Sequence, residues 1–137
     1  MKIAIYLAFA ATACSSQPAN NASESLEEFS ERLRNHPAPS VSAVAALEQG
    51  LAKIECVGPL DQWQRQYAFS VRTTTVDETV IDFELKQAGR AGITSSLIRT
   101  HPGAFLGNDD TPTKMAAGQY DTRSGKITLD FCGENVG

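Results

Sequence analysis

The sequence holds few of the residues on which enzymes and metal sites depend. Only two of its 137 residues are histidines, His36 and His101, and both precede proline in loop-like contexts. The chain has no G-x-S-x-G elbow, no H-E-x-x-H pair and no glycine-rich phosphate loop. Its densest acidic stretch, Asn108–Thr111, lacks the spacing of a calcium loop. We therefore expect no catalytic residue, no metal ligand and no cofactor, and we favour a non-catalytic protein over an enzyme.

Positive charge is also scarce, since 12 Lys and Arg residues stand against 16 Asp and Glu residues, for a formal net charge of −4. A mildly acidic chain has no electrostatic reason to bind nucleic-acid phosphates, so we expect no nucleic-acid partner. No apolar run approaches the roughly 20 residues that a membrane-spanning helix needs. Attachment to a membrane would then need a lipid anchor.

The N-terminus has the layout of a secretory signal. Met1-Lys2 supplies a positive start, Ile3–Ala11 is a short apolar run, and Ala11-Thr12-Ala13 precedes Cys14. This arrangement resembles a bacterial lipoprotein signal, which implies that Cys14 becomes the lipidated N-terminus of the mature chain. Ser15 after that cysteine matches the sorting preference of outer-membrane lipoproteins. The resemblance predicts a lipid-anchored protein on the periplasmic face of the outer membrane.

Two other outcomes of processing are open. Ordinary cleavage after Ala13 would leave Cys14 as a free N-terminal thiol on a secreted or soluble periplasmic protein, and the segment could also remain uncleaved. On the favoured interpretation, residues 1–13 are the signal peptide and residues 14–23 are a lipidated tether. Residues 24–137 then form a single domain, which is long enough to bury a core of its own.

Three cysteines occur in the chain, Cys14, Cys56 and Cys132. If Cys14 takes the lipid, the remaining two can pair, and a disulfide persists only in an oxidising compartment such as the periplasm. We therefore predict a Cys56–Cys132 bond. The alternative is two buried, reduced cysteines that behave as small apolar residues.

Two helices are predicted before any strand. Ser25 and Glu28 have the spacing of a capping box, and the helix that they begin ends at His36-Pro37. Ser40 caps a second helix, whose apolar residues recur at helical spacing from Val44 to Ile54, with Cys56 at its end. Gly50, inside this second helix, either allows close approach to a sheet or is simply tolerated.

The rest of the chain alternates with period two, as strands do. The strands are predicted around residues 63–72, 81–85, 93–100, 115–120 and 126–131, with a turn at Gly125 closing the last hairpin. The fold class is therefore α+β, with two N-terminal helices packed on one face of a four- or five-stranded antiparallel sheet. Strict alternation places Phe131 with Ile127 and Leu129 on the apolar side, so the predicted bond requires Cys132 at a strand end or past a bulge.

Two features are candidates for contact with a partner. Phe105 and Leu106 lie in a long loop between glycines and prolines, where they either plug the core or form an exposed contact. Gln64, Gln66 and Arg72 lie on the polar side of the first strand and could form a contact surface. The alternative is that this side is an ordinary solvated face.

Residues 40–92 also resemble small helix-helix-sheet lipoproteins that accompany the outer-membrane β-barrel assembly machinery. The resemblance rests on a helix followed by Gly58-Pro59, on the aromatic strand of Trp63 and Tyr67, and on a strand ending near Gly89. It supports the fold class, and no functional residue is carried over from it.

The expected function is a non-catalytic binding or accessory module in the cell envelope, with an envelope protein or a small ligand as its partner. The alternative is a small-ligand-binding or enzymatic domain. In that case aromatic residues of the predicted sheet, Trp63, Tyr67, Phe69 and Phe83, would line a pocket between helices and sheet instead of filling a core.

Overall fold

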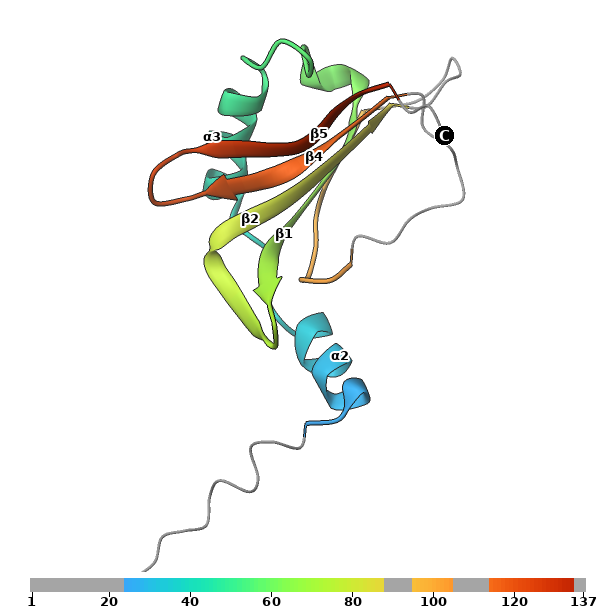
Figure 1. Cartoon of the computed structure of the whole chain (residues 1–137), viewed down its shortest axis with the longest axis vertical. Coiled ribbons are helices and arrows are strands. Elements are labelled where there is room, and N and C mark those ends of the chain that lie inside the picture. Colours follow the sequence, from blue (N-terminus) through green and yellow to red (C-terminus); the bar gives the residue numbers. More distant parts are fainter. Residues whose placement is uncertain (1–23, 88–94, 105–113, 135–137) are drawn as a thin grey trace, which may run out of the picture.

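The computed structural model describes residues 24–87, 95–104 and 114–134. These residues form two helices, α2 (Leu26–Arg34) and α3 (Val41–Leu51), and a short 3-10 turn, η1 (Leu60–Gln62) (Figure 1). Five strands follow: β1 (Gln64–Arg72), β2 (Thr75–Gln87), β3 (Ser96–Arg99), β4 (Lys114–Asp121) and β5 (Ile127–Glu134). The predicted α+β class, with its helices before its strands, is confirmed. The signal and tether predicted for residues 1–23, with Cys14, lie outside the described residues.

The strands form one sheet in the order β3-β1-β2-β4-β5. Three of its pairs are antiparallel, but β3 runs parallel to β1, with Gln64 opposite Ser96 and Tyr67 opposite Arg99. The sheet is therefore mixed, and the prediction of a purely antiparallel sheet was wrong. The cause is that β3 does not stay beside β2 but pairs on the far side of β1. Period-two alternation reports which face a side chain occupies, and it carries no information on strand direction.

Both predicted helix starts are confirmed. The Ser25 hydroxyl accepts from the Glu28 N–H while the Glu28 carboxylate accepts from the Ser25 N–H, which completes the capping box. The Ser40 hydroxyl accepts from the Ala43 N–H at 3.1 Å. Helix α3 ends at Leu51, however, so Cys56 lies in the turns that follow the helix rather than at its end.

Only one of the two helices contributes to the core. Val44, Leu47 and Leu51 of α3 are buried, whereas α2 has no buried residue. They pack against a set of buried residues from the sheet and its approach: Val57, Trp63, Tyr67, Ile81, Phe83, Leu85, Ala116 and Tyr120. Helix α2 instead lies by the end of the β1–β2 hairpin (Figure 1), where the Arg32 guanidinium donates to the Thr74 carbonyl. The expectation that both helices pack on the sheet is corrected accordingly.

At Gly50, α3 packs closely against Ile127 of β5. A methyl group at this position would lie 2.7 Å from Cδ1 of Ile127. The glycine therefore permits the close approach of helix and sheet, which was one of the two interpretations of its place in the helix. This contact brings α3 over the last strand of the chain.

The Cys56–Cys132 disulfide is present, with 6.2 Å between the two Cα atoms. It depends on an irregularity between β4 and β5, where Ala117 is opposite Phe131 but Gly118 is opposite Leu129. Asp130 is thus an extra residue, which reverses the alternation beyond it. Cys132 consequently lies on the α3 side, and Phe131 turns to the opposite face with 46% of its surface exposed. The prediction that Phe131 shares a face with Ile127 and Leu129 was wrong for that reason.

Candidate binding face

The sheet has one side covered by α3, here called the inner face, and one turned away from α3, here called the outer face. Side chains of the outer face alternate with the core residues along each strand and follow the strand register. They are Ser96 and Ile98 of β3, Gln64, Gln66, Ala68 and Ser70 of β1, Asp82, Glu84 and Lys86 of β2, Met115, Ala117 and Gln119 of β4, and Thr128 and Phe131 of β5. Polar groups dominate its centre, and several of them are half-buried.

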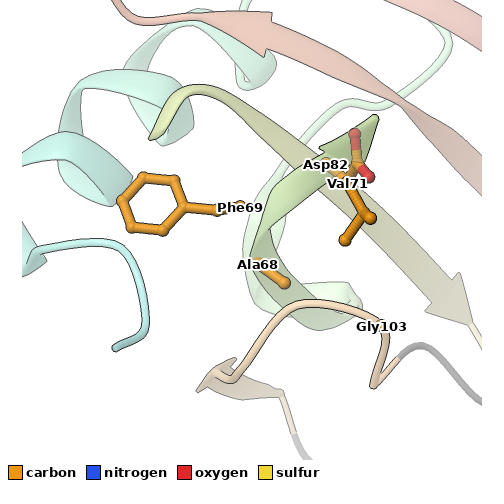
Figure 2. A pocket seen from close by; sticks show the side chains of 5 residues that line it. All are labelled: Ala68, Phe69, Val71, Asp82 and Gly103. Atoms are coloured by element: carbon orange, nitrogen blue, oxygen red, sulfur yellow. The ribbon is translucent and has the colours of Figure 1, made fainter. Parts of the chain in front are cut away.

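A hollow of about 180 Å³ opens at one end of the outer face, lined by Ala68, Phe69, Val71, Asp82 and Gly103. Figure 2 shows the Ala68 methyl pointing toward the segment that carries Gly103. The Phe69 ring points the other way, toward the helices (Figure 2), where it forms a T-shaped contact with the His36 ring at 5.8 Å between centroids. The hollow therefore has small apolar walls from Ala68 and Val71 and one carboxylate, Asp82.

Asp82 has polar neighbours on both adjoining strands. The side-chain amide of Gln119 donates to Oδ1 of Asp82 at 3.0 Å and lies 3.3 Å from the Ser70 hydroxyl oxygen. Burial nevertheless raises the pKa of Asp82, because the hydrogen bonds from Gln119 and Ser70 only partly offset the loss of water around the charge. The nearby Asp130 carboxylate also raises this pKa, and the Arg72 guanidinium lowers it.

A second, smaller hollow of about 30 Å³ lies on the same face, lined by Gln64, Gln66, Glu84, Lys86, Ser96 and Ile98. It brings together two of the residues singled out from the sequence, Gln64 and Gln66. Glu84 and Lys86 form an ion pair of 2.8 Å beside them. The buried Oε1 of Gln66 has no hydrogen-bond partner among the described residues, and the hollow is large enough to hold a water molecule that donates to it.

The other predicted contact residues are not part of this group. Arg72 lies at the β1–β2 hairpin with 64% of its side chain exposed, and its Nε is 3.2 Å from the Asp77 carboxylate. Phe105 and Leu106 lie outside the described residues.

A third hollow, of about 290 Å³, separates α2 from the segment that follows β3. It is lined by Ser30, Leu33, Arg34, His101, Pro102, Gly103 and Ala104. One ring nitrogen of His101, Nδ1, lies 2.9 Å from the Pro102 carbonyl oxygen. Gly103 therefore borders two hollows, and its φ of +80° is one that residues with a side chain rarely adopt.

None of these three hollows opens into the core, although Phe69, whose ring points toward the helices, borders the first of them. Trp63, Tyr67 and Phe83 line none of them and are fully or almost fully buried in the core. The Tyr67 hydroxyl donates to Oε2 of Glu48 at 2.6 Å, and Arg65 donates to the same oxygen at 2.7 Å. Burial first, and then the adjoining Glu48 carboxylate, raise the pKa of Tyr67. This network joins α3 to β1 and leaves the Tyr67 hydroxyl neutral.

Sequence reasoning missed Asp82 and Gly103. Asp82 alternates with Glu84 and Lys86, which is the pattern of a solvated strand face. Ala68 was the one residue that could have indicated the hollow, because a small side chain on β1 leaves space beside a carboxylate on β2. That signal needs the register of the two strands, which places Ala68 opposite Asp82.

Within residues 24–87, 95–104 and 114–134, no three His, Cys, Asp or Glu side chains are placed to hold a metal ion together. Among the same residues, no helix combines the length and apolar character needed to cross a bilayer.

Compared with protein-family models, curated proteins and solved structures, the chain has no significant match.

Proposed function

We propose that this protein is a lipid-anchored, non-catalytic binding or accessory domain of the cell envelope, attached through Cys14 to the periplasmic face of the outer membrane. The observation that carries the proposal is the Cys56–Cys132 disulfide. A disulfide of this kind is expected in an oxidising compartment and rare in the cytosol. It agrees with the signal-like residues Met1–Ala13, which would direct the chain to the same compartment.

The outer face is the proposed contact surface. Its centre is polar and half-buried, and it carries two hollows, whereas the inner face is filled by α3. Phe131, at one edge of this face, adds an exposed aromatic ring of the kind that protein interfaces favour. The partner is an envelope protein or a small ligand that makes polar contacts with this face.

A small-ligand-binding or enzymatic domain is the second candidate, and the hollow at Asp82 is the observation that favours it. The hollow combines apolar walls with a carboxylate whose pKa is raised by burial, a combination found at many functional sites. Of the four aromatic residues that the sequence suggested for such a pocket, only Phe69 lines this hollow, and Trp63, Tyr67 and Phe83 are buried in the core.

Processing at Cys14 tests the anchor. Cells expressing the full chain are treated with an inhibitor of lipoprotein signal peptidase, and the protein is followed by gel mobility and membrane fractionation. We expect the unprocessed form to accumulate, and the Cys14→Ser variant to leave the outer-membrane fraction. Normal processing in the presence of the inhibitor would contradict the lipid anchor.

The contact surface has a separate test. A photo-crosslinking amino acid at Phe131, on the outer face, should capture a reproducible envelope partner in intact cells. The matched control places the same amino acid at Val41, which is 66% exposed on α3. Equal capture from both positions, or from neither, would count against the outer face as the contact surface.

A further inference from the structure

We propose that the hollow at Asp82 binds the terminal ammonium group of an alkylamine, with the alkyl stem against Ala68 and Val71. The inference rests on the proposed function, because it assigns a ligand class to the proposed contact surface. Two sources share this chemistry, a free primary amine and a lysine side chain of a partner protein.

The size and lining of the hollow favour the end of a chain over a whole cofactor. Its volume of about 180 Å³ is below the roughly 300 Å³ at which pockets for drug-sized ligands begin. Ala68 and Val71 offer methyl groups on one side, and the backbone of Gly103 closes the other without a side chain. A short run of methylene groups would find apolar contact along this path and reach Asp82 with its polar end.

The charge in the hollow is unbalanced. Among the described residues, no Lys, Arg or His forms an ion pair with Asp82, although its carboxylate is half-buried. The nearby cation, Arg72, pairs with Asp77 at 3.2 Å, and Asp130 adds negative charge. An ammonium group in the hollow would supply the missing positive charge, and an opposite charge stabilises the ionised carboxylate.

The hydrogen bonds of Asp82 favour an ammonium group over a guanidinium group. Gln119 already donates to Oδ1 of Asp82. A guanidinium group binds a carboxylate best through two parallel hydrogen bonds that use both oxygens, and here it would have to share Oδ1 with Gln119. An ammonium group acts as a point charge and needs no such fork.

The test is an NMR titration of the full chain, purified in detergent, with n-butylamine as the probe at pH 7. We expect shifts at the amides of Ala68, Val71 and Gly103 and at the side-chain amide of Gln119. The isosteric variant Asp82→Asn should weaken binding about thirtyfold or more, the lower end of the range found when one partner of a buried charge pair is removed. Asp61→Asn, which changes an exposed carboxylate on η1, is the matched control and should bind as the wild type does.

Four further measurements distinguish the possible outcomes. Val71→Phe keeps the carboxylate but fills the hollow, so it should also lose binding. Butan-1-ol tests whether apolar contact suffices, and butylguanidine tests the preference for ammonium. A lysine-containing tripeptide with blocked termini separates the two sources: shifts with the peptide assign the hollow to a partner's lysine, and shifts with butylamine alone assign it to a free amine.

The proposal is overturned if no amine shifts these resonances at millimolar concentration, if butan-1-ol shifts them equally, or if Asp82→Asn binds as the wild type does. Butylguanidine binding tighter than butylamine would overturn the assignment to an ammonium group. None of these results depends on Cys14, so loss of the lipid anchor and failure of the hollow would be distinguished.

Discussion

The same strands form both faces of the sheet, but the two faces differ in how their side chains are covered and paired. On the inner face, α3 covers aromatic and aliphatic side chains, and a disulfide and a Glu48–Tyr67–Arg65 network fasten the helix side to the strands. On the outer face, polar side chains stand half-buried around hollows, and a carboxylate has no cationic partner among the described residues. The difference teaches that stability resides on the inner face and room for a partner on the outer one.

The disulfide should make the largest contribution to that contrast. Replacing both cysteines, as Cys56→Ser with Cys132→Ser, should lower the free energy of unfolding by about 4.5 kcal/mol in the chain-entropy model, because the bond closes a loop with a sequence separation of 76. Urea denaturation of the purified chain measures the loss. Cys14→Ser is the control and should unfold as the wild type does. If the free energy of unfolding of the double variant lies within about 1 kcal/mol of the wild-type value, the disulfide is not a main source of stability.

Substitution of Gly118 should cause the second-largest loss of stability. A methyl group at this position would collide with the Thr128 carbonyl oxygen and lie 3.0 Å from Cζ of Phe83. Because backbone cannot move aside easily, Gly118→Ala should cost about 3 kcal/mol in thermal or urea unfolding.

Gly50→Ala is the matched control for this substitution. Its new methyl group would meet only the flexible end of Ile127, and alanine raises helix propensity by about 1 kcal/mol. Gly50→Ala should therefore cost less than Gly118→Ala. The reverse order would show that the approach of α3 is more constrained than the register of β4 and β5.

Tyr67→Phe should have a smaller effect. It removes a hydrogen bond to a carboxylate, which contributes about 1.5 kcal/mol, and it leaves Glu48 paired with Arg65. Tyr120→Phe is the control, because no hydrogen bond of the Tyr120 hydroxyl is found among the described residues. Equal unfolding free energies for the two variants would mean that the network does not hold α3 to β1.

Asp82→Asn should change the free energy of unfolding least, and the size of the change should depend on pH. Because burial raises the pKa of Asp82 in the folded state, the carboxyl group binds its proton more tightly there than in the unfolded chain. The wild type therefore loses stability as pH rises from the ordinary Asp pKa, about 3.9, through the raised value. The variant lacks this loss, so its stability relative to the wild type should be greater at pH 7 than in acid.

Asp121→Asn supplies a control with the opposite sign. Backbone N–H groups of Arg123 and Ser124 lower the pKa of Asp121, so its contribution is present at neutral pH and is lost on acidification. The variant should be less stable than the wild type at pH 7, and the two should converge in acid. Unfolding curves at several pH values compare both carboxylates, and a common sign would contradict the assigned environments.

Local signals in the sequence were sufficient for much of the fold. Ser25 and Ser40 could be predicted as helix starts because N-capping involves only the next few residues. Gly125, with a φ of +76°, could be placed in the last hairpin turn because a turn is likewise a local feature. The Cys56–Cys132 pair followed from counting. These features need no knowledge of which elements meet in space.

What the sequence did not predict depends on distant contacts. Whether β3 runs parallel or antiparallel depends on which strand it pairs with, and it pairs with β1. Whether α2 is buried depends on whether another segment leaves apolar surface for it to cover. The hollow at Asp82 required Ala68 and Gly103 to meet it from other segments. The Asp130 bulge was anticipated only as a condition of the disulfide, because nothing in residues 127–134 marks it.

That bulge links covalent chemistry to strand pairing. Without the extra residue at Asp130, Cys132 would point away from α3 and from Cys56, so oxidation of this pair selects chains whose β5 has reached its native register against β4. The presence of the bond therefore indicates that β5 has paired with β4 in the native register. The ratio of oxidised to reduced molecules, read during refolding, would count the chains that have completed their last strand.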